Sequence, residues 1–228
     1  FFCLGDGPKF GISYIGEVVS YKIRKKIWSC KKYAVNLCRQ IDKESFLKCC
    51  LFKKKKESME KKDVVFFFGA KNLNGEFSNH FMADFEIFGH VYNCVEQYMM
   101  AQKALIFKDY KRLNEILNSK DPVEMRNIGR EVEGFDSQRW DRVKVKVVKN
   151  AVRAKFLQNE ALKAKLLATG KKVLVESNPT DRVWGIGFAK SDKRVMEKVD
   201  KWGGNLLGKI LSEVREELRE GEKVKEVA

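Results

Sequence analysis

The chain changes character near residue 58, and this break limits how much of it can form one folded core. The first 58 residues carry a net charge of +9 and five of the six cysteines, whereas the rest of the 228 residues carry only +6. Regular apolar patterns begin at Val64. We therefore expect a basic, cysteine-bearing extension without stable order over residues 1–58, one domain over 59–220, and a charged tail over 221–228.

The extension ends in a run of four lysines, Lys53 to Lys56. Such a run can act as a nuclear-import signal or bind polyanions, but more often it is a solvated stretch, and we favour that interpretation. Cys49 and Cys50 are adjacent and lack the paired spacing of a zinc site, so we expect no metal there. The segment lacks the pattern of a secretory signal or a transit peptide. We expect a cytoplasmic protein, with the nucleus as the alternative through the lysine run.

The composition excludes several classes of protein. Hydrophobic residues make up 44% of the chain, which is enough for a sizeable core, and no stretch approaches the roughly 18–20 apolar residues of a membrane helix. Collagen, a wholly disordered chain and an integral membrane protein are excluded, and we expect no membrane partner. The total charge of +15 would suit nucleic-acid binding, but more than half of it lies in the extension.

The body of the chain predicts helices joined by a few short strands. Strands are expected over Val64–Phe68, over 85–91 as two strands turning at Gly89, and over Val173–Val175. Helices are expected over Val95–Phe107, Pro122–Gly129, Trp140–Phe156, Ala161–Ala168 and Leu206–Leu218. The second of these would begin with Asp121 as its cap and Glu124 reaching back to the cap, and the fourth would stop at Gly170. Residues 177–205 are expected to be mostly loop, with a short helix around Val195. The fold class is α+β, predominantly helical, in a single compact domain.

One pair of polar residues shares a face of the helix that begins at Val95. Glu96 and Lys103 are seven residues apart, about 10 Å along the axis, and Gln102 neighbours that face. In an apolar cleft, such a pair would supply a general acid or base and an amine that acts as a nucleophile or as an electrostatic clamp. From spacing alone, an exposed charged face is the stronger alternative.

A second candidate is the glycine-containing loop from Asp181 to Gly187. Asp181, Trp184 and Gly185 suggest a tight turn with exposed backbone N–H groups and an aromatic plate that holds a ribose, a phosphate or a base. The alternative is an ordinary turn packed by a core tryptophan. Asn205, after two glycines, either caps the last helix or helps free N–H groups meet an anion. His80 and His90 are isolated in the sequence, so we expect no metal and no cofactor.

An ordered set of short motifs resembles the NADAR (YbiA-like) family from about Val64 to Leu218. The motifs are Phe77-Ser78-Asn79, Val95 to Lys103, Gly129-Arg130, Trp140-Asp141, Lys155-Phe156, Leu166 to Gly170, Leu174-Val175-Glu176, Asp181 to Gly187, Asn205 to Gly208, and Arg215. Each motif is weak alone, whereas the ordered set is specific. The chain departs from the family at Gln97, where the family usually has His.

The resemblance implies a YbiA-like domain that hydrolyses the bond between a phosphorylated ribose, or ADP-ribose, and a nitrogenous base. Some relatives act on early intermediates of riboflavin biosynthesis, and others remove ADP-ribose from guanine in nucleic acid. For cleavage of such a bond we expect Glu96 to act as acid or base and Lys103 to capture the opened sugar as a Schiff base, and the alternative is direct attack of water steered by Glu96 or Asp181. The substrate-binding residues would be Asn79, Gln102, Arg130, Trp140, Trp184, Gly185 and Asn205, although Trp140 suits the core equally well.

Three functions remain open from the sequence. The first is this N-glycosidase, whose partner is a small phosphorylated ribosyl base or ADP-ribosylated guanine, free or in nucleic acid. The second is a non-catalytic module that binds ADP-ribose or a nucleotide and tolerates loss of Glu96. The third is a polyanion-binding protein that acts through residues 1–58, in which case deletion of that segment abolishes function.

Overall fold

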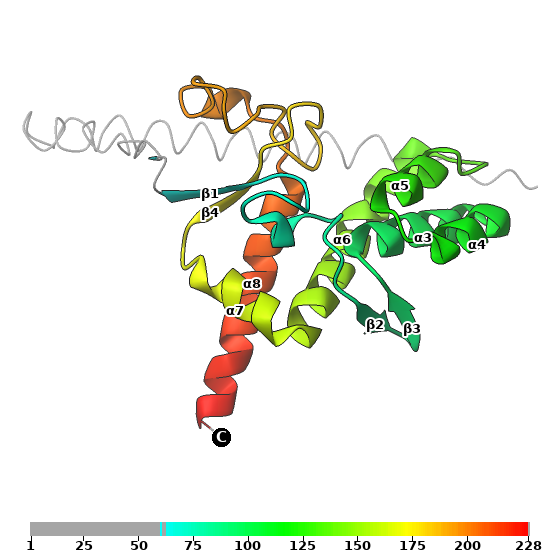
Figure 1. Cartoon of the computed structure of the whole chain (residues 1–228), viewed down its shortest axis with the longest axis horizontal. Helices are drawn as coiled ribbons and strands as arrows, with labels where there is room; N and C mark the ends of the chain where they lie inside the picture. Colours follow the sequence, from blue (N-terminus) through cyan, green and yellow to red (C-terminus); the bar gives the residue numbers. More distant parts are fainter. Residues whose placement is uncertain (1–59, 61–62, 228) are drawn as a thin grey trace, which may run out of the picture. The chain divides into compact units, whose positions relative to one another are not determined.

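The part of the chain that the structure describes combines six α-helices with four short strands (Figure 1). The structure is a computed structural model, and it describes residue 60 and residues 63–227. The predicted extension over residues 1–58 lies outside the described residues. The α+β, predominantly helical fold class is as predicted from the sequence.

Helix α3 (Val95–Phe107) lies at the centre of a group of four helices. It packs against α4 (Tyr110–Asn118), α5 (Pro122–Arg130) and α6 (Ser137–Gln158) (Figure 1). Nine of the residues of α3 are buried, and some of these are polar or charged. Because burial strips water from these side chains, they need partners inside the protein or in a ligand.

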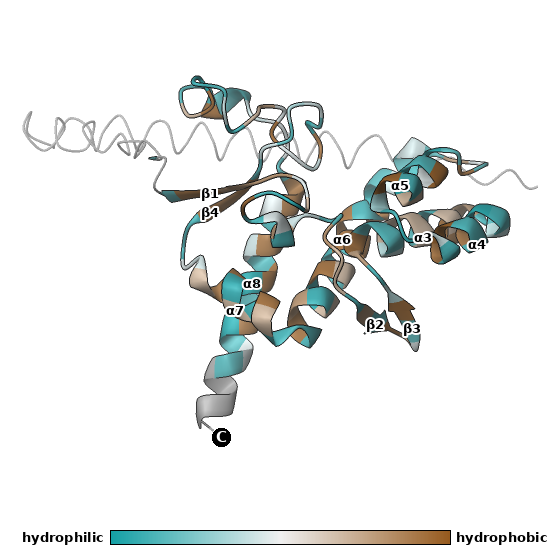
Figure 2. Cartoon of the chain, in the orientation of Figure 1, coloured by the Kyte–Doolittle hydropathy of each residue, from teal (hydrophilic) through white to brown (hydrophobic). Residues whose placement is uncertain are grey.

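Strands β1 (Val64–Phe67) and β4 (Val173–Glu176) form a parallel pair, and their last residues are paired in register. Helix α7 (Glu160–Ala168) leads into β4, and α8 (Leu206–Val227) packs against β4. Strand β1 is hydrophobic along its length (Figure 2). Gly208 allows the close contact of α8 with β4, because a Cβ atom there would lie 2.1 Å from a carbonyl oxygen of the strand.

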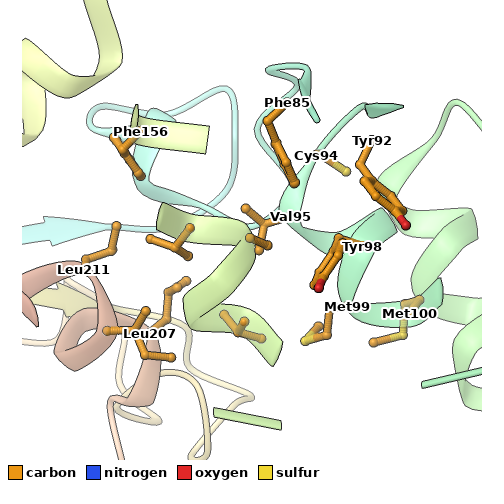
Figure 3. Close-up of a cluster of buried hydrophobic side chains, with 14 of the residues drawn as sticks. Phe85, Tyr92, Cys94, Val95, Tyr98, Met99, Met100, Phe156, Leu207 and Leu211 are labelled. Atoms are coloured by element: carbon orange, nitrogen blue, oxygen red, sulfur yellow. The ribbon is translucent and has the colours of Figure 1, made fainter. Parts of the chain in front are cut away.

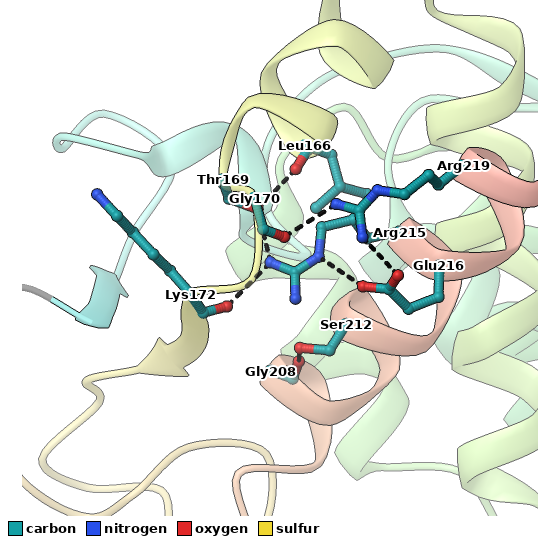
Figure 4. A network of polar contacts seen from close by, with 9 residues as sticks. All are labelled: Leu166, Thr169, Gly170, Lys172, Gly208, Ser212, Arg215, Glu216 and Arg219. Carbon is teal, nitrogen blue, oxygen red and sulfur yellow. Dashed lines mark hydrogen bonds and ion pairs between the residues drawn. The ribbon is translucent and has the colours of Figure 1, made fainter. Parts of the chain in front are cut away.

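An arginine on α8 holds the turn between α7 and β4 (Figure 4). Arg215 is buried and donates hydrogen bonds of 2.7 Å to the Thr169 hydroxyl and 2.9 Å to the Lys172 carbonyl oxygen. Gly170 lies in the same turn with a φ of 62°, which suits glycine and ends α7 as predicted. These bonds fix the start of β4 against α8.

A hairpin of two short strands packs beside α3 and α6. Strands β2 (Phe85–Ile87) and β3 (His90–Tyr92) are antiparallel, and the turn between them contains Gly89 with a φ of 80°. The predicted pair of strands turning at Gly89 is therefore confirmed. The ring centroids of Tyr92 and Tyr98 lie 4.9 Å apart at 84°, which joins the hairpin to the core around α3 (Figure 3).

Helix α4 was not predicted from the sequence. Its cap is nevertheless a recognisable signal, since the Asp109 side chain accepts a 3.0 Å hydrogen bond from the Arg112 backbone N–H. Helix α4 is strongly amphipathic, and Ile116 on its apolar face is fully buried.

Helix α5 begins as predicted but differs in detail. Asp121 caps it and accepts from the Val123 N–H at 3.0 Å. Glu124 does not reach back to the cap, because its carboxylate instead accepts a 2.5 Å hydrogen bond from the Ser119 hydroxyl. Gly129 does not end α5, which continues to Arg130.

The segment before α8 also differs from the prediction. The expected helix around Val195 is wrong: this region forms turns, and a short 3₁₀ helix occurs instead at Val199–Lys201. Helix α8 does not end at Leu218 but continues to Val227. The predicted charged tail, residues 221–228, is therefore helical in its described part.

Candidate active site

A pocket of about 230 Å³ lies where α3 and α5 approach the end of β4 and two loops. Six of the ten residues predicted for the site line this pocket: Asn79, Glu96, Lys103, Arg130, Asp181 and Trp184. The fold thus gathers residues from segments that are distant in the sequence.

Two larger hollows, of about 520 and 480 Å³, lie beside β1. Both are lined by Phe66, Leu73 and Lys190 among others, and none of the predicted site residues lines either of them. Three buried ionisable side chains, Glu96, Lys103 and Glu176, line the smaller pocket, and among the described residues no buried charged residue lines the larger two. We therefore take that pocket as the candidate active site.

Glu96 lies in the first turn of α3 with its side chain buried in the wall of the pocket. Burial raises the pKa of Glu96 to about 7, although the cationic side chains of Arg126 and Arg130 oppose this rise. The Nε2 atom of His80 lies 3.6 Å from a carboxyl oxygen of Glu96. A carboxyl with such a pKa can both give and take a proton near neutral pH.

Lys103 lies two turns further along the same face of α3, and only 8% of it is exposed. Its Nζ donates a 2.6 Å hydrogen bond to the carbonyl oxygen of Gly129 and lies 4.1 Å from the ring centroid of Phe135. Burial and the charge of Arg130 lower the pKa of Lys103, whereas Glu96 raises it. A lowered pKa makes the neutral, nucleophilic amine easier to form.

The Asp181 carboxylate closes the loop that carries Trp184. Its Oδ1 accepts hydrogen bonds of 2.7 Å from the Val183 N–H and 2.9 Å from the Trp184 N–H. The Ile186 N–H donates to the Glu176 carbonyl oxygen. The N–H groups of Val183, Trp184, Ile186 and Gly187 are therefore bonded within the protein, and Asp181 and Trp184 line the pocket.

The other four predicted residues do not line the pocket. Gln102 lies close enough to the Tyr92 hydroxyl to lower its pKa, although burial raises that pKa overall, and Trp140 belongs to the hydrophobic core. Gly185 supports the loop, because a Cβ atom there would lie 2.8 Å from the Glu176 carbonyl oxygen.

Asn205 braces the strand that ends at the pocket. Its Oδ1 accepts a 3.1 Å hydrogen bond from the Glu176 N–H, and its Nδ2 donates at 2.9 Å to the Leu174 carbonyl oxygen. The amide is thus committed to β4. The N–H groups of Gly203 and Gly204 donate to loop carbonyls at 2.8 and 2.7 Å, so they are not free for an anion.

Five polar residues of the pocket were not predicted: Ser78, His80, Arg126, Glu176 and Asn178. Arg126 could have been predicted from the sequence, because it lies one helical turn before Arg130 on the same face of α5. His80 could not, since its contact with Glu96 depends on the fold.

The side chain of Gln97 bonds to groups outside the pocket. Its Nε2 lies within 3.1–3.3 Å of the carbonyl oxygens of Ile116, Leu117 and Ser119, and its Oε1 accepts from the Asn93 N–H at 2.8 Å. Gln97 thus fastens α3 to the end of α4 and does not line the pocket.

A family model described as the NADAR domain matches residues 66–219, which is most of the chain. The chain belongs to the NADAR family. The family match includes every residue that lines the pocket. The resemblance inferred from the ordered motifs is therefore confirmed.

Several NADAR relatives are similar over the same region. N-glycosidase R617 of Acanthamoeba polyphaga mimivirus is 40% identical over 70% of this chain and 98% of its own length. N-glycosidase YbiA of Escherichia coli K12 is 33% identical over 68% of the chain and 88% of its own length. The riboflavin biosynthesis protein VVA0006 of Vibrio vulnificus is 32% identical over 68% of the chain, but over only 39% of its own length.

The fold of this NADAR protein also matches a solved structure. The NMR structure of E. coli YbiA superposes with a TM-score of 0.59 at 30% identity, covering 74% of this chain and 92% of YbiA. Within residues 60 and 63–227, no helix is both long and apolar enough to cross a membrane. The same residues contain no group of three or more His, Cys, Asp or Glu side chains placed to hold a metal ion.

Proposed function

We propose that this NADAR protein hydrolyses the ribosyl C1–N bond of a phosphoribosylated or ADP-ribosylated base, with Glu96 as acid and base and Lys103 as nucleophile. Relatives named N-glycosidases indicate the reaction class, a hydrolase acting on N-glycosyl bonds. One observation carries the assignment of roles. Glu96 and Lys103 are buried in one pocket, and burial favours the neutral form of each.

The reaction begins with the proton of Glu96. Transfer of this proton to the ribose ring oxygen allows the C1–O bond to break, and the lone pair of the base nitrogen forms a C1=N bond. The neutral amine of Lys103 then attacks C1. The base leaves with its bonding electrons and a proton, and a Lys103–C1 imine remains. Water hydrolyses this imine, which releases the sugar as an aldehyde and regenerates Lys103.

Direct attack by water is the alternative route. Glu96 or Asp181 would then orient the water towards C1 while the base departs, and no bond to Lys103 would form. Lys103 would act only through its charge. The two routes give the same products, so they are separated by trapping rather than by product analysis.

The cationic wall of the pocket suits the phosphate of such a substrate. Arg126 and Arg130 lie on one face of α5, and both line the pocket. The Nε atom of Arg126 is buried, with no hydrogen-bond partner in the described structure. Guanidinium groups pair well with phosphate oxygens. The volume of about 230 Å³ is below the roughly 300 Å³ typical of ligand pockets, so we expect it to enclose the ribosyl phosphate and leave the base beside Trp184.

The test is product analysis by mass spectrometry. The full chain is incubated with ADP-ribosylated guanosine and, separately, with the phosphoribosylaminouracil intermediate of riboflavin biosynthesis. We expect release of the free base from at least one of them. Binding without release would instead support the non-catalytic ADP-ribose module.

Two variants test the roles of the residues. We expect Glu96→Gln to lower kcat by about 10²–10⁴-fold, because the glutamine amide cannot transfer a proton to the ribose ring oxygen. Borohydride should trap a covalent adduct in the wild type and none in Lys103→Ala. If both variants keep full turnover, the assignment of this helix face is wrong. If the wild type turns over substrate but borohydride traps no adduct, water attacks C1 directly.

A further inference from the structure

Glu176, at the end of β4, lines the pocket, and the proposed reaction does not use it. Its N–H donates to Asn205 Oδ1, and its carbonyl oxygen accepts from the Ile186 N–H at 3.0 Å. Gly185 packs against that carbonyl so closely that no other residue fits there without a shift. The backbone of Glu176 is therefore held at its N–H and at its carbonyl group, in the wall of the pocket.

The pocket contains polar atoms that are buried and have no partner. Within the described part of the chain, three buried side-chain atoms lack a hydrogen-bond partner: Asn79 Oδ1, Arg126 Nε and Glu176 Oε2. All three belong to residues that line this one pocket. Because an unpaired buried polar atom destabilises the folded protein, the presence of all three in one pocket indicates that a ligand supplies the missing partners.

Glu176 faces many charged and titratable groups. They are Glu96 and Lys103 from α3, Arg126 and Arg130 from α5, Asp181 from the following loop and His80 from the loop before β2. Burial raises the pKa of Glu176 to about 8, and the negative charges of Asp181 and Glu96 add to this rise. At neutral pH the side chain is therefore mainly a neutral carboxyl, which carries one O–H donor and one acceptor oxygen.

We propose that Glu176 positions the substrate as a neutral carboxyl that hydrogen-bonds a ribose hydroxyl, and so selects ribosyl over deoxyribosyl substrates. Of the three unpaired groups, Asn79 Oδ1 accepts a hydrogen bond, Arg126 Nε donates one, and the neutral carboxyl of Glu176 can do both. Neighbouring sugar hydroxyls match this set, because each hydroxyl both donates and accepts. The inference rests on the proposed function and adds the group that recognises the sugar.

The test measures binding without turnover. The probes are methyl ribofuranoside 5-phosphate and its 2-deoxy and 3-deoxy analogues, whose blocked C1 prevents ring opening and reaction with Lys103. Titration calorimetry of the full chain at pH 7 should give at least about tenfold weaker binding for one deoxy analogue. We expect Glu176→Gln, which keeps a donor and an acceptor in the same shape, to retain this discrimination, and Glu176→Met to lose it.

A second readout separates positioning from a purely structural role. Between pH 7 and 9, Glu176 loses its proton in the wild type, so affinity for the ribo probe should fall by about tenfold, whereas Glu176→Gln should lose clearly less affinity. The matched control is Ser177→Ala, because the buried Ser177 bonds the Phe67 carbonyl oxygen outside this pocket. This control should preserve both the discrimination and the pH dependence of the wild type.

Two results would overturn the proposal. One is equal affinity of the wild type for the ribo and both deoxy probes. The other is loss of discrimination in Glu176→Gln as complete as in Glu176→Met, which would mean that the ionised carboxylate acts. Neither result depends on turnover. Failure of the proposed hydrolysis is seen separately, as absence of free base in the product analysis.

Discussion

Lys103 of α3 donates its 2.6 Å hydrogen bond to the carbonyl oxygen of Gly129, a residue within α5. The bond is possible because the two helices approach closely: a Cβ atom on Gly129 would lie 2.1 Å from the Met100 sulfur. The absence of a side chain at residue 129 therefore sets the position of the proposed nucleophile.

Gly129→Ala should push α5 away from α3. Overpacking of this kind typically costs about 1–3 kcal/mol, and we expect a loss of this size in the free energy of unfolding. Turnover should fall as well, because the hydrogen bond to Lys103 lengthens. Urea denaturation and steady-state kinetics measure the two effects.

The control is the double variant Gly129→Ala with Met100→Ala, which removes the clashing side chain. We expect turnover to recover in part relative to Gly129→Ala alone. If Met100→Ala gives no recovery, the glycine acts by some other route than close helix packing.

Gln97→Ala should destabilise the protein without changing substrate preference. Loss of this amide removes its hydrogen bonds to three carbonyl oxygens at the end of α4 and to the Asn93 N–H, which costs about 1–3 kcal/mol. The KM for a substrate should stay within about twofold, because Gln97 does not line the pocket. A changed ratio of kcat/KM between two substrates would contradict this assignment.

Lys155 should make stability depend on pH. It is buried, and its Nζ donates to the Glu76 and Ser78 carbonyl oxygens at 2.7 and 3.1 Å, next to Asn79 of the pocket. Burial lowers the pKa of Lys155 to about 7. Between pH 7 and about 10 the unfolded chain binds a proton that the folded chain lacks, so the free energy of unfolding rises with pH.

Lys155→Met should remove this contribution, which amounts to at most about 1.4 kcal/mol per pH unit. Urea denaturation of both proteins at pH 7.5 and 9 measures the difference. Parallel pH profiles for the wild type and the variant would show that Lys155 stays charged in the folded state. The variant should also raise KM, since the two bonds position the loop that carries Asn79.

A chain that begins at Met59 should retain hydrolysis. The pocket and the family match both lie beyond this residue. We expect kcat/KM within about twofold of the full chain for a small substrate. Loss of all activity in the shorter chain, with its fold intact by circular dichroism, would favour a function carried by residues 1–58.

Local patterns in the sequence were enough for most of the fold. The bounds of α3 follow from helical spacing after Cys94, and the hairpin follows from short apolar runs on either side of Gly89. These predictions succeeded because the sequence pattern that indicates each element lies within the residues that form it. The helix expected near Val195 failed because Trp202 packs against this segment and its ring N–H donates to the Val195 carbonyl oxygen, a contact that local propensity does not contain.

The sequence by itself determined the family, the helix face that pairs Glu96 with Lys103, and the residue types that suit a ribosylated base. Only the tertiary structure decided which of them meet. It turned Gln97 towards α4, placed Trp140 in the core and Trp184 at the pocket, and brought Glu176 and Glu96 into the wall of one pocket. Spacing along a helix fixes which side chains share a face, but burial and charge at a pocket arise from segments that only the packed chain brings together.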